Sequence, residues 1–326
     1  NNGLRDLQQA VATQAERSVT FNWKSSMHIL NYRNFSLLHV SLGAGTTPKQ
    51  AIAYLSTLKQ VEWVEPNYIF QGPDPREYIP NDPSYSAQYH HPLMQNHLAW
   101  DSTLGSPTVR IAVLDDGVQL NHPDLSANIW VNPGEIPGDG IDNDGNGYID
   151  DVNGWDVASN DNNPNPNSSG DDHGTHVAGI AAGRTDNFIG IAGVAGHSTI
   201  VPIRWYGSGS WTASVAAQGY AYGVATGTKI FNASYNLDGW ANNATVITAL
   251  NAAYDAGALL FNSAGNNGQL NPARQVLDQV IFVASTTETD ARSSFSNYGF
   301  GIDLSAPGSN ILSTIIGGTG YASYSG

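Results

Sequence analysis

The 326-residue sequence contains no cysteine and few basic residues. Without cysteine the chain can form neither a disulfide framework nor a zinc–thiolate site, and it has no thiol nucleophile. Lysine and arginine number 13 against 28 aspartates and glutamates, which gives a formal net charge of −15 at pH 7. Because nucleic-acid binding depends on clustered basic side chains, this balance argues against a nucleic-acid partner. It suits an exported protein or one that binds cations.

Long apolar runs are also missing from the sequence. No stretch approaches the roughly 18–20 residues that a membrane-spanning helix needs, so we expect no membrane span. The chain begins at Asn1 without a methionine and shows no signal-peptide pattern, which we interpret as a processed form or a fragment. A large extracellular protein without disulfides often needs another stabilising element, and bound Ca²⁺ is one candidate.

The first region, residues 1–72, predicts a small α+β domain. An apolar strand-like run at 37–42 precedes a helical pattern over 48–59. The sequence TTP at the start of this pattern suits an N-cap and a first helical turn. A second strand-like stretch follows at 61–70.

The rest of the chain divides into a linker and a large α/β domain. Residues 73–83 hold four prolines and are expected to form an exposed linker. In residues 84–326, short β-rich runs alternate with helical patterns at about 174–184, 211–226 and 242–256. Apolar strands separated by helix-length segments indicate a parallel sheet with helices on both faces. The β-rich runs are VRIAVLDDG, TIVPIRWY, KIFNASYN, GALLFNSAGN, VIFVASTT and GIDLSAPG.

Three polar residues stand where predicted strands end or a helix begins. Asp115 ends the first strand of the large domain, His173 opens HGTHVAGIAAG, and Asn266 follows an apolar strand in NSAGNNG. In a parallel sheet such positions share the carboxyl edge. A carboxylate that orients a histidine base, together with an amide for an oxyanion, fits serine hydrolysis. Each residue alone would be an ordinary cap, turn or loop residue, so the interpretation rests on their order and placement together.

Neighbouring residues offer alternatives that the sequence disfavours. The pair His173 and His176 suggests a metal site but lacks the glutamate and the spacing of zinc proteases. Ser323 and Ser325 are candidate nucleophiles, yet no helix start follows either of them. Asp116 would raise the pKa of neighbouring groups if it pointed inward. Because side chains alternate along an extended chain, we expect it to point away.

These segments resemble the motifs of the subtilisin-like serine proteases. VLDDGV is similar to their aspartate motif, HGTHVAG to their histidine motif, SAGNNG to their oxyanion-asparagine motif, and LSAPGSNILST to the stretch before the nucleophile. The resemblance covers about residues 81–326, and the order Asp, His, Ser is that of subtilisin. In the family the glycine matched by Gly326 continues into Thr-Ser-Met-Ala. The resemblance therefore implies a nucleophile two residues beyond Gly326 and an inactive 326-residue chain.

The same resemblance implies residues that contact the substrate. GSGSWTAS is similar to the family segment that pairs as a strand with an extended peptide, which implies roles for Gly207, Gly209 and Trp211. The tripeptide Ser234-Tyr235-Asn236 stands where the family has Ser-Leu-Gly beside the primary pocket, and Gly265 precedes the oxyanion asparagine. Asn236 in place of glycine puts a side chain at the rim of that pocket.

A polar insertion at 132–172 predicts a Ca²⁺ site. Within it, DNDGNGYID resembles the first nine positions of an EF-hand loop, with oxygen ligands at alternate positions and glycine at the sixth. The twelfth position is Asn153 instead of glutamate, so we expect a calcium loop without an EF-hand fold; a disordered acidic turn is the alternative. From the family resemblance alone, Asp124 and Asn187 are implied as ligands of a second, structural Ca²⁺. The expected ligands of the first site are Asp142, Asp144, Asn146, the carbonyl of Tyr148, and Asp150.

The segment VEWVEPNYIF resembles the end of the family's propeptide. The resemblance implies that residues 1–72 assist folding and occlude the active site, with processing between about Gln71 and Asp82. We interpret the complete protein as a secreted serine endopeptidase that acts on proteins and peptides. An inactive protease-fold binding protein and a calcium-dependent adhesion module are the alternatives.

Overall fold

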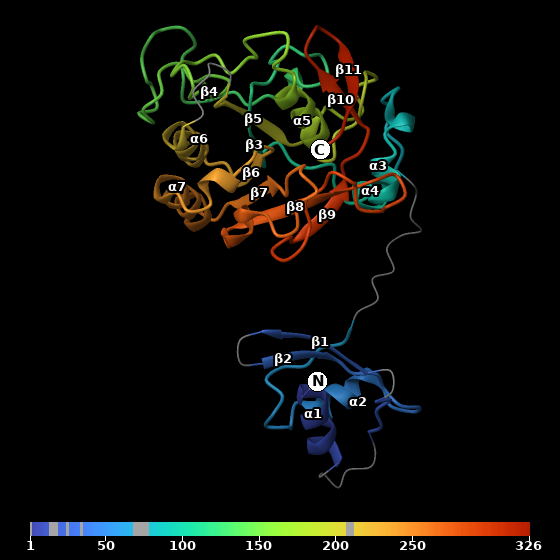
Figure 1. Ribbon diagram of the computed structural model, residues 1–326. Coiled ribbons are helices and arrows are strands. Elements are labelled where there is room, and N and C mark those ends of the chain that lie inside the picture. The colour runs from blue at the N-terminus through green and yellow to red at the C-terminus, as the bar shows by residue number, and fades with distance from the viewer. Residues whose placement is uncertain (1, 13–18, 24–25, 33–34, 68–77, 207–211) are drawn as a thin grey trace. The chain divides into compact units, whose positions relative to one another are not determined.

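The structure, a computed structural model, describes residues 2–12, 19–23, 26–32, 35–67, 78–206 and 212–326. The chain divides into two compact units, Asn1–Asp74 and Pro75–Gly326 (Figure 1). Over the described ranges, no helix is both long and apolar enough to cross a membrane.

The smaller unit contains two helices and a hairpin. Helix α1 spans Asn2–Ala12 and α2 spans Pro48–Leu55, while β1 (Met27–Tyr32) pairs antiparallel with β2 (Phe35–His39). The predicted start of α2 is confirmed, because Thr47 and Gln50 form a reciprocal capping box around Pro48.

The prediction of a strand at 61–70 is wrong for residues 61–67, which form no strand. Val61 and Val64 instead pack against a buried cluster formed by α1, α2 and the residues after α2. Partial burial of isolated valines explains the apolar pattern without strand pairing. The buried members of this cluster are Leu7, Tyr54, Leu55 and Leu58.

The larger unit is built on a seven-stranded sheet in the order β4-β5-β3-β6-β7-β8-β9, and all of its strand pairs are parallel. Each of the β-rich runs predicted from the sequence contributes one strand, so the predicted α/β class is confirmed. The short strand β4 was not predicted. The strands are β3 (Arg110–Asp115), β4 (Trp155–Asp156), β5 (Thr199–Arg204), β6 (Ile230–Ala233), β7 (Leu259–Ser263), β8 (Val280–Thr286) and β9 (Leu304–Pro307).

Helices cover both faces of this sheet, as predicted (Figure 1). Along β3, Ala112 and Leu114 belong to the cluster that contains α6 and α7, whereas Ile111 and Val113 belong to the cluster that contains α5. This alternation follows from the two-residue repeat of a strand that is buried on both sides. The three helices are α5 (His173–Ala182), α6 (Ala213–Ala225) and α7 (Ala244–Asp255).

A hairpin that the sequence did not predict holds α5 from outside the sheet. Strands β10 (Ile311–Ile315) and β11 (Gly320–Tyr324) pair antiparallel and lie beside α5 in Figure 1. The Ser313 and Thr314 hydroxyls each donate at 2.7 Å to a main-chain carbonyl of α5. The remaining short helices are η1 (Tyr85–Ala87), α3 (His90–Leu93), α4 (Asn96–Trp100), η2 (Ser126–Asn128), η3 (Asp238–Trp240) and η4 (Ala273–Val276).

Residues 78–83, which the sequence assigned to an exposed linker, pack against the loop at 186–190. Asp82 is buried and accepts from the Asp186 N–H at 2.9 Å, while the Asn81 N–H donates to Asp186 at 3.0 Å. These contacts make 78–83 part of the larger unit, because a solvated linker would leave its polar groups to water.

Candidate active site

Asp115 and His173 form a hydrogen-bonded pair at the carboxyl edge of the sheet. The Asp115 Oδ1 lies 2.7 Å from His173 Nδ1, and Asp115 is buried while half of the His173 side chain is exposed. Desolvation lowers the pKa of His173, but the hydrogen bond and charge of Asp115, aided by nearby carboxylates, raise it overall above its ordinary value. An oriented imidazole with one open side suits a general base.

A close approach between β3 and α5 brings this pair together. A Cβ on Gly174 would stand 2.3 Å from the Gly117 carbonyl oxygen and 2.8 Å from Asp115 Cβ. Only glycine fits at the second position of the helix. The HGTH sequence therefore places His173 against the end of β3.

Asp116 does not point away from the site, contrary to the prediction from alternation. Its side chain is buried, and its carboxylate accepts the main-chain N–H groups of His173 and Gly174. The strand β3 ends at Asp115, so the alternation that applies within a strand no longer sets the direction of the next side chain.

Asn266 lies in a tightly held loop after β7. Gly265 adopts a φ of +99°, which favours glycine, and the Asn266 residue that follows is exposed. Among the described residues the Asn266 amide has no hydrogen-bond partner. Buried Asn297 holds the loop, accepting from Asn267 N at 3.1 Å and donating to the Ala264 carbonyl at 2.9 Å. The sequence analysis did not single out Asn297.

The predicted pocket residues are joined by an arginine that the sequence analysis also missed. Arg274 is buried, and its Nη2 donates to Asn236 Oδ1 at 2.7 Å. The same nitrogen lies 2.9 Å from the point where a Cβ would stand on Gly265. Asp238 pairs with the Arg274 guanidinium at 3.0 Å. One guanidinium therefore lies between Asn236, which is expected beside the primary pocket, and Gly265.

Of the other predicted substrate-binding residues, the structure describes Ser234 and Tyr235 but not those at 207–211. The Tyr235 ring packs on Trp205 with centroids 4.1 Å apart, so this side chain serves the core. Ser234 accepts a hydrogen bond from Asn232. Gly207, Gly209 and Trp211 lie outside the described residues.

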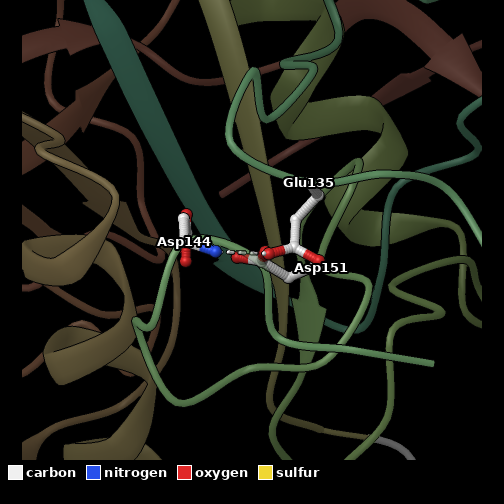
Figure 2. A group of neighbouring side chains, drawn as sticks. All are labelled: Glu135, Asp144 and Asp151. Carbon is white, nitrogen blue, oxygen red and sulfur yellow. Dashed lines mark hydrogen bonds between the residues drawn. The ribbon is translucent and has the colours of Figure 1, made fainter. Parts of the chain in front are cut away.

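Three acidic side chains in the polar insertion have carboxylate oxygens within 4.8 Å of one another: Glu135, Asp144 and Asp151 (Figure 2). The Asp144 N–H donates to Glu135 at 3.3 Å, and the Asn132 amide bridges Asp144 and Asp151 at 3.0 and 2.7 Å. Burial raises the pKa of Asp151. An oxygen-only cluster of this kind fits a hard cation such as Ca²⁺.

This cluster shares only Asp144 with the ligand set expected from the EF-hand-like pattern. The Asp142 carboxylate accepts from the N–H groups of Asn146 and Gly147, and the Asp150 carboxylate accepts from those of Gly138 and Gly140. The Asn146 amide nitrogen donates to Asp151 at 3.1 Å, and the Tyr148 ring packs on Trp155 and Tyr222. Glu135 and Asp151 lie outside the nine-residue motif, which is why the motif did not reveal them.

The two residues implied as ligands of a second Ca²⁺ lie together, with the Asn187 amide donating to Asp124 at 2.7 Å. Asp82, which the sequence analysis did not include, is buried nearby, and its Oδ1 has no hydrogen-bond partner among the described residues. Burial raises the pKa of Asp124 and raises that of Asp82 to about 6, with the Asp124 charge contributing to the latter. A partnerless buried carboxylate oxygen fits a cation ligand.

An Asp–His pair and an exposed amide at the carboxyl edge of a parallel sheet define a hydrolase-like site on an α/β fold. Residues 106–326 match the Subtilase family. The chain therefore belongs to the subtilases, a family of serine endopeptidases.

Several curated proteases are similar to this chain. Thermitase from Thermoactinomyces vulgaris is 39% identical over 76% of this chain and 80% of its own length. Thermophilic serine proteinase from Bacillus sp. (strain AK1) is 36% identical over 82% of this chain, and halolysin from Haloferax mediterranei is 35% identical over 86%. The chain spans only 59% and 50% of the lengths of these last two relatives.

Solved structures support the same assignment. A protease from Pseudoalteromonas arctica matches 76% of this chain and 82% of its own, with a TM-score of 0.60 and 26% identity. A cold-adapted subtilisin-like serine proteinase matches 69% of this chain and 71% of its own, with a TM-score of 0.52 and 27% identity.

Proposed function

We propose that the whole protein hydrolyses peptide bonds with a triad in which Asp115 and His173 are the first two members. The observation that carries this proposal is the 2.7 Å contact between Asp115 Oδ1 and His173 Nδ1. With Nδ1 donating to the carboxylate, Nε2 is left unprotonated to take the proton of a serine hydroxyl. His173 then returns that proton to the leaving amine, while Asp115 stabilises the imidazolium.

Asn266 is proposed as the side-chain donor to the oxyanion. Its Nδ2 lies 3.5 Å from the point where a Cβ would stand on Gly326, and the Gly326 N–H donates to the Gly308 carbonyl at 2.8 Å. This proximity supports a nucleophile two residues after Gly326, as the family's serine motif implies. A preorganised amide at that place would stabilise charge that develops on the substrate carbonyl.

Ca²⁺ is proposed as a structural cofactor at two places. Asp82 and Asp124 with the loop around Asn187 would hold one ion, and the 135–151 cluster would hold the other. When bound, Ca²⁺ neutralises buried carboxylates and stabilises the fold that binds it. The buried Oδ1 of Asp82 and the convergence of Glu135 with Asp151 support these assignments.

Residues 1–72 are proposed to be a propeptide that binds the mature domain, and the substrates are proposed to be proteins and peptides. The separate compact unit 1–74 supports the first point. Secretion is also proposed, because relatives carry the name extracellular protease, as in Xanthomonas campestris and Dichelobacter nodosus.

The test uses the full-length protein and a peptide substrate. His173→Ala should lower kcat by roughly 10⁶, and Asn266→Ala by roughly 10²–10³. The chain ending at Gly326 should be inactive, and changing the serine two residues beyond it to alanine should abolish activity without unfolding the protein. A folded full-length wild type without peptidase activity would favour the alternative of a protease-fold binding protein.

A further inference from the structure

Helix α5 receives no cap from its own N-cap residue. The first N–H groups of a helix have no partner within the helix, and a side chain before it commonly accepts one of them. Asp172 occupies the N-cap position but makes no side-chain capping bond, and its carboxylate accepts the Tyr324 hydroxyl instead. The capping acceptor for α5 must come from elsewhere.

Asp116, which lies 57 residues before His173, supplies that acceptor. Its Oδ1 accepts the Gly174 N–H at 2.7 Å and its Oδ2 accepts the His173 N–H at 3.2 Å. The Asp116 residue is only 5% exposed. A carboxylate at a helix N-terminus is also favoured by the helix dipole.

Asp116 is itself firmly held. Its N–H donates to Asp115 Oδ1 at 2.9 Å, and the Nε of fully buried Arg204 donates to its carbonyl at 3.2 Å. Arg204 in turn pairs with buried Asp156 of β4. A series of polar contacts therefore runs from the edge strand β4 through Arg204 of β5 and Asp116 to the first residue of α5.

We propose that Asp116 is a positioning residue for His173: it fixes the main chain of the histidine while Asp115 fixes its imidazole. This inference rests on the proposed function. Because the two aspartates are adjacent, a displacement of α5 from the end of β3 would break both contacts together. The two aspartates thus fix the main chain and the imidazole of His173 at the same time.

The Asp116 carboxylate also contributes charge. Burial and the Asp115 carboxylate raise the pKa of Asp116 to about 7, and its charge in turn favours protonated His173. Removing that charge should therefore lower the pKa of His173. The ionisable groups around these two residues are Asp115, Asp172, His176, Arg204 and Tyr324.

The experiment compares Asp116→Ala and Asp116→Asn in the full-length protein, with rates normalised to titrated active sites. Asp116→Ala should lower kcat about tenfold with KM changed less than about twofold, because a small misplacement of a catalytic group slows the chemical step. Asp116→Asn should recover part of kcat, since its amide oxygen can still accept one N–H. Both variants should move the acid limb of kcat/KM to lower pH. Asp171→Asn is the control: over the described part of the chain that carboxylate accepts only the N–H groups of residues 167 and 168, so the variant should change neither kcat nor the acid limb.

A second measurement does not depend on activity. NMR titration of the His173 imidazole should give a lower pKa in Asp116→Asn than in the wild type. Wild-type kcat per active site together with an unmoved imidazole pKa in both variants would overturn the inference. An inactive wild type whose imidazole pKa still responds to Asp116→Asn would overturn the proposed function and leave the positioning of His173 supported.

Discussion

Nη2 of Arg274 lies 2.7 Å from Oδ1 of Asn236, a residue expected at the rim of the primary specificity pocket. The guanidinium also donates to Asp238 at 3.0 Å and to the Ser263 carbonyl at 2.7 Å. The positive charge of Arg274 is thus paired with Asp238, and its N–H groups donate to other groups of the protein. If Asn236 stands at the rim of the primary pocket as expected, Arg274 holds that rim in place without offering a free charge to the substrate.

Arg274→Met should alter cleavage preference at the residue before the scissile bond. Removing the guanidinium leaves the partly exposed Asp238 carboxylate unpaired and frees Asn236 and the Ser263 carbonyl from their hydrogen bonds to it. We expect kcat/KM to fall at least about tenfold on the preferred peptide and the preference among peptides to flatten. A peptide series varied at that residue measures this. Arg274→Lys keeps the positive charge but loses the planar guanidinium geometry. Its kcat/KM should therefore lie between those of the wild type and Arg274→Met. An unchanged preference profile in Arg274→Met would contradict the assignment.

Calcium should raise the melting temperature of the full-length protein, and chelation should reverse the rise. A ligand that binds only the folded form stabilises by about 2.7 kcal/mol at a hundredfold excess over Kd. The double variant Glu135→Gln/Asp151→Asn should remove the part of this rise that comes from the 135–151 site. Asp82→Asn should remove the part that comes from the site at Asp82 and Asp124.

Asp142→Asn separates the two ligand sets proposed for the insertion. Its carboxylate accepts main-chain N–H groups at 146 and 147 and lies outside the cluster of Figure 2. If Glu135 and Asp151 are ligands, Asp142→Asn should keep the calcium response. If the EF-hand-like set is correct instead, Asp142→Asn should lose it and Glu135→Gln should not.

Residues 1–72, added as a separate chain, should inhibit the activated enzyme and then be degraded by it. The unit has its own core around Tyr54, Leu55 and Leu58, so we expect the separate chain to fold and to bind the enzyme as a folded domain. Inhibition kinetics at micromolar concentration measure the effect, and Leu55→Asp is a matched variant with a disrupted core. Equal inhibition by both chains, or none by either, would count against the propeptide role.

The stability of the larger unit should fall as pH drops below about 6.5, partly because of His90 and His91. Burial lowers the pKa of His90 to about 3 and that of His91 to about 4, and both ring nitrogens of His90 lack partners among the described residues. A folded-state pKa below the unfolded value contributes stability at neutral pH that is lost on acidification, at up to about 1.4 kcal/mol per pH unit for each group. His90→Phe should reduce the fall in unfolding temperature between pH 6.5 and pH 4. A slope identical to the wild type would exclude His90 as a cause.

Local sequence patterns were sufficient for the strands and helices that surround the candidate site. Continuous apolar runs predicted β3 and β5 to β9, and the Gly/Ala-rich sequence after His173 predicted α5. They failed at 61–67, where isolated valines are partly buried without strand pairing, and they missed the hairpin β10–β11. Pairing between strands depends on partners that a local pattern does not contain.

The sequence by itself determined the α/β class, the strand-end positions of Asp115 and Asn266, and the helix-start position of His173. Short-range periodicity and motif spacing carry that information. Only the tertiary structure decided that Asp116 turns inward to cap α5, that Arg274 joins Asn236 to the Gly265 loop, and that Glu135 and Asp151 meet Asp144. Each of these contacts joins residues from different segments of the chain. Side-chain direction at the end of a strand or within a loop follows from whichever partner the fold brings near, so no local pattern specifies it.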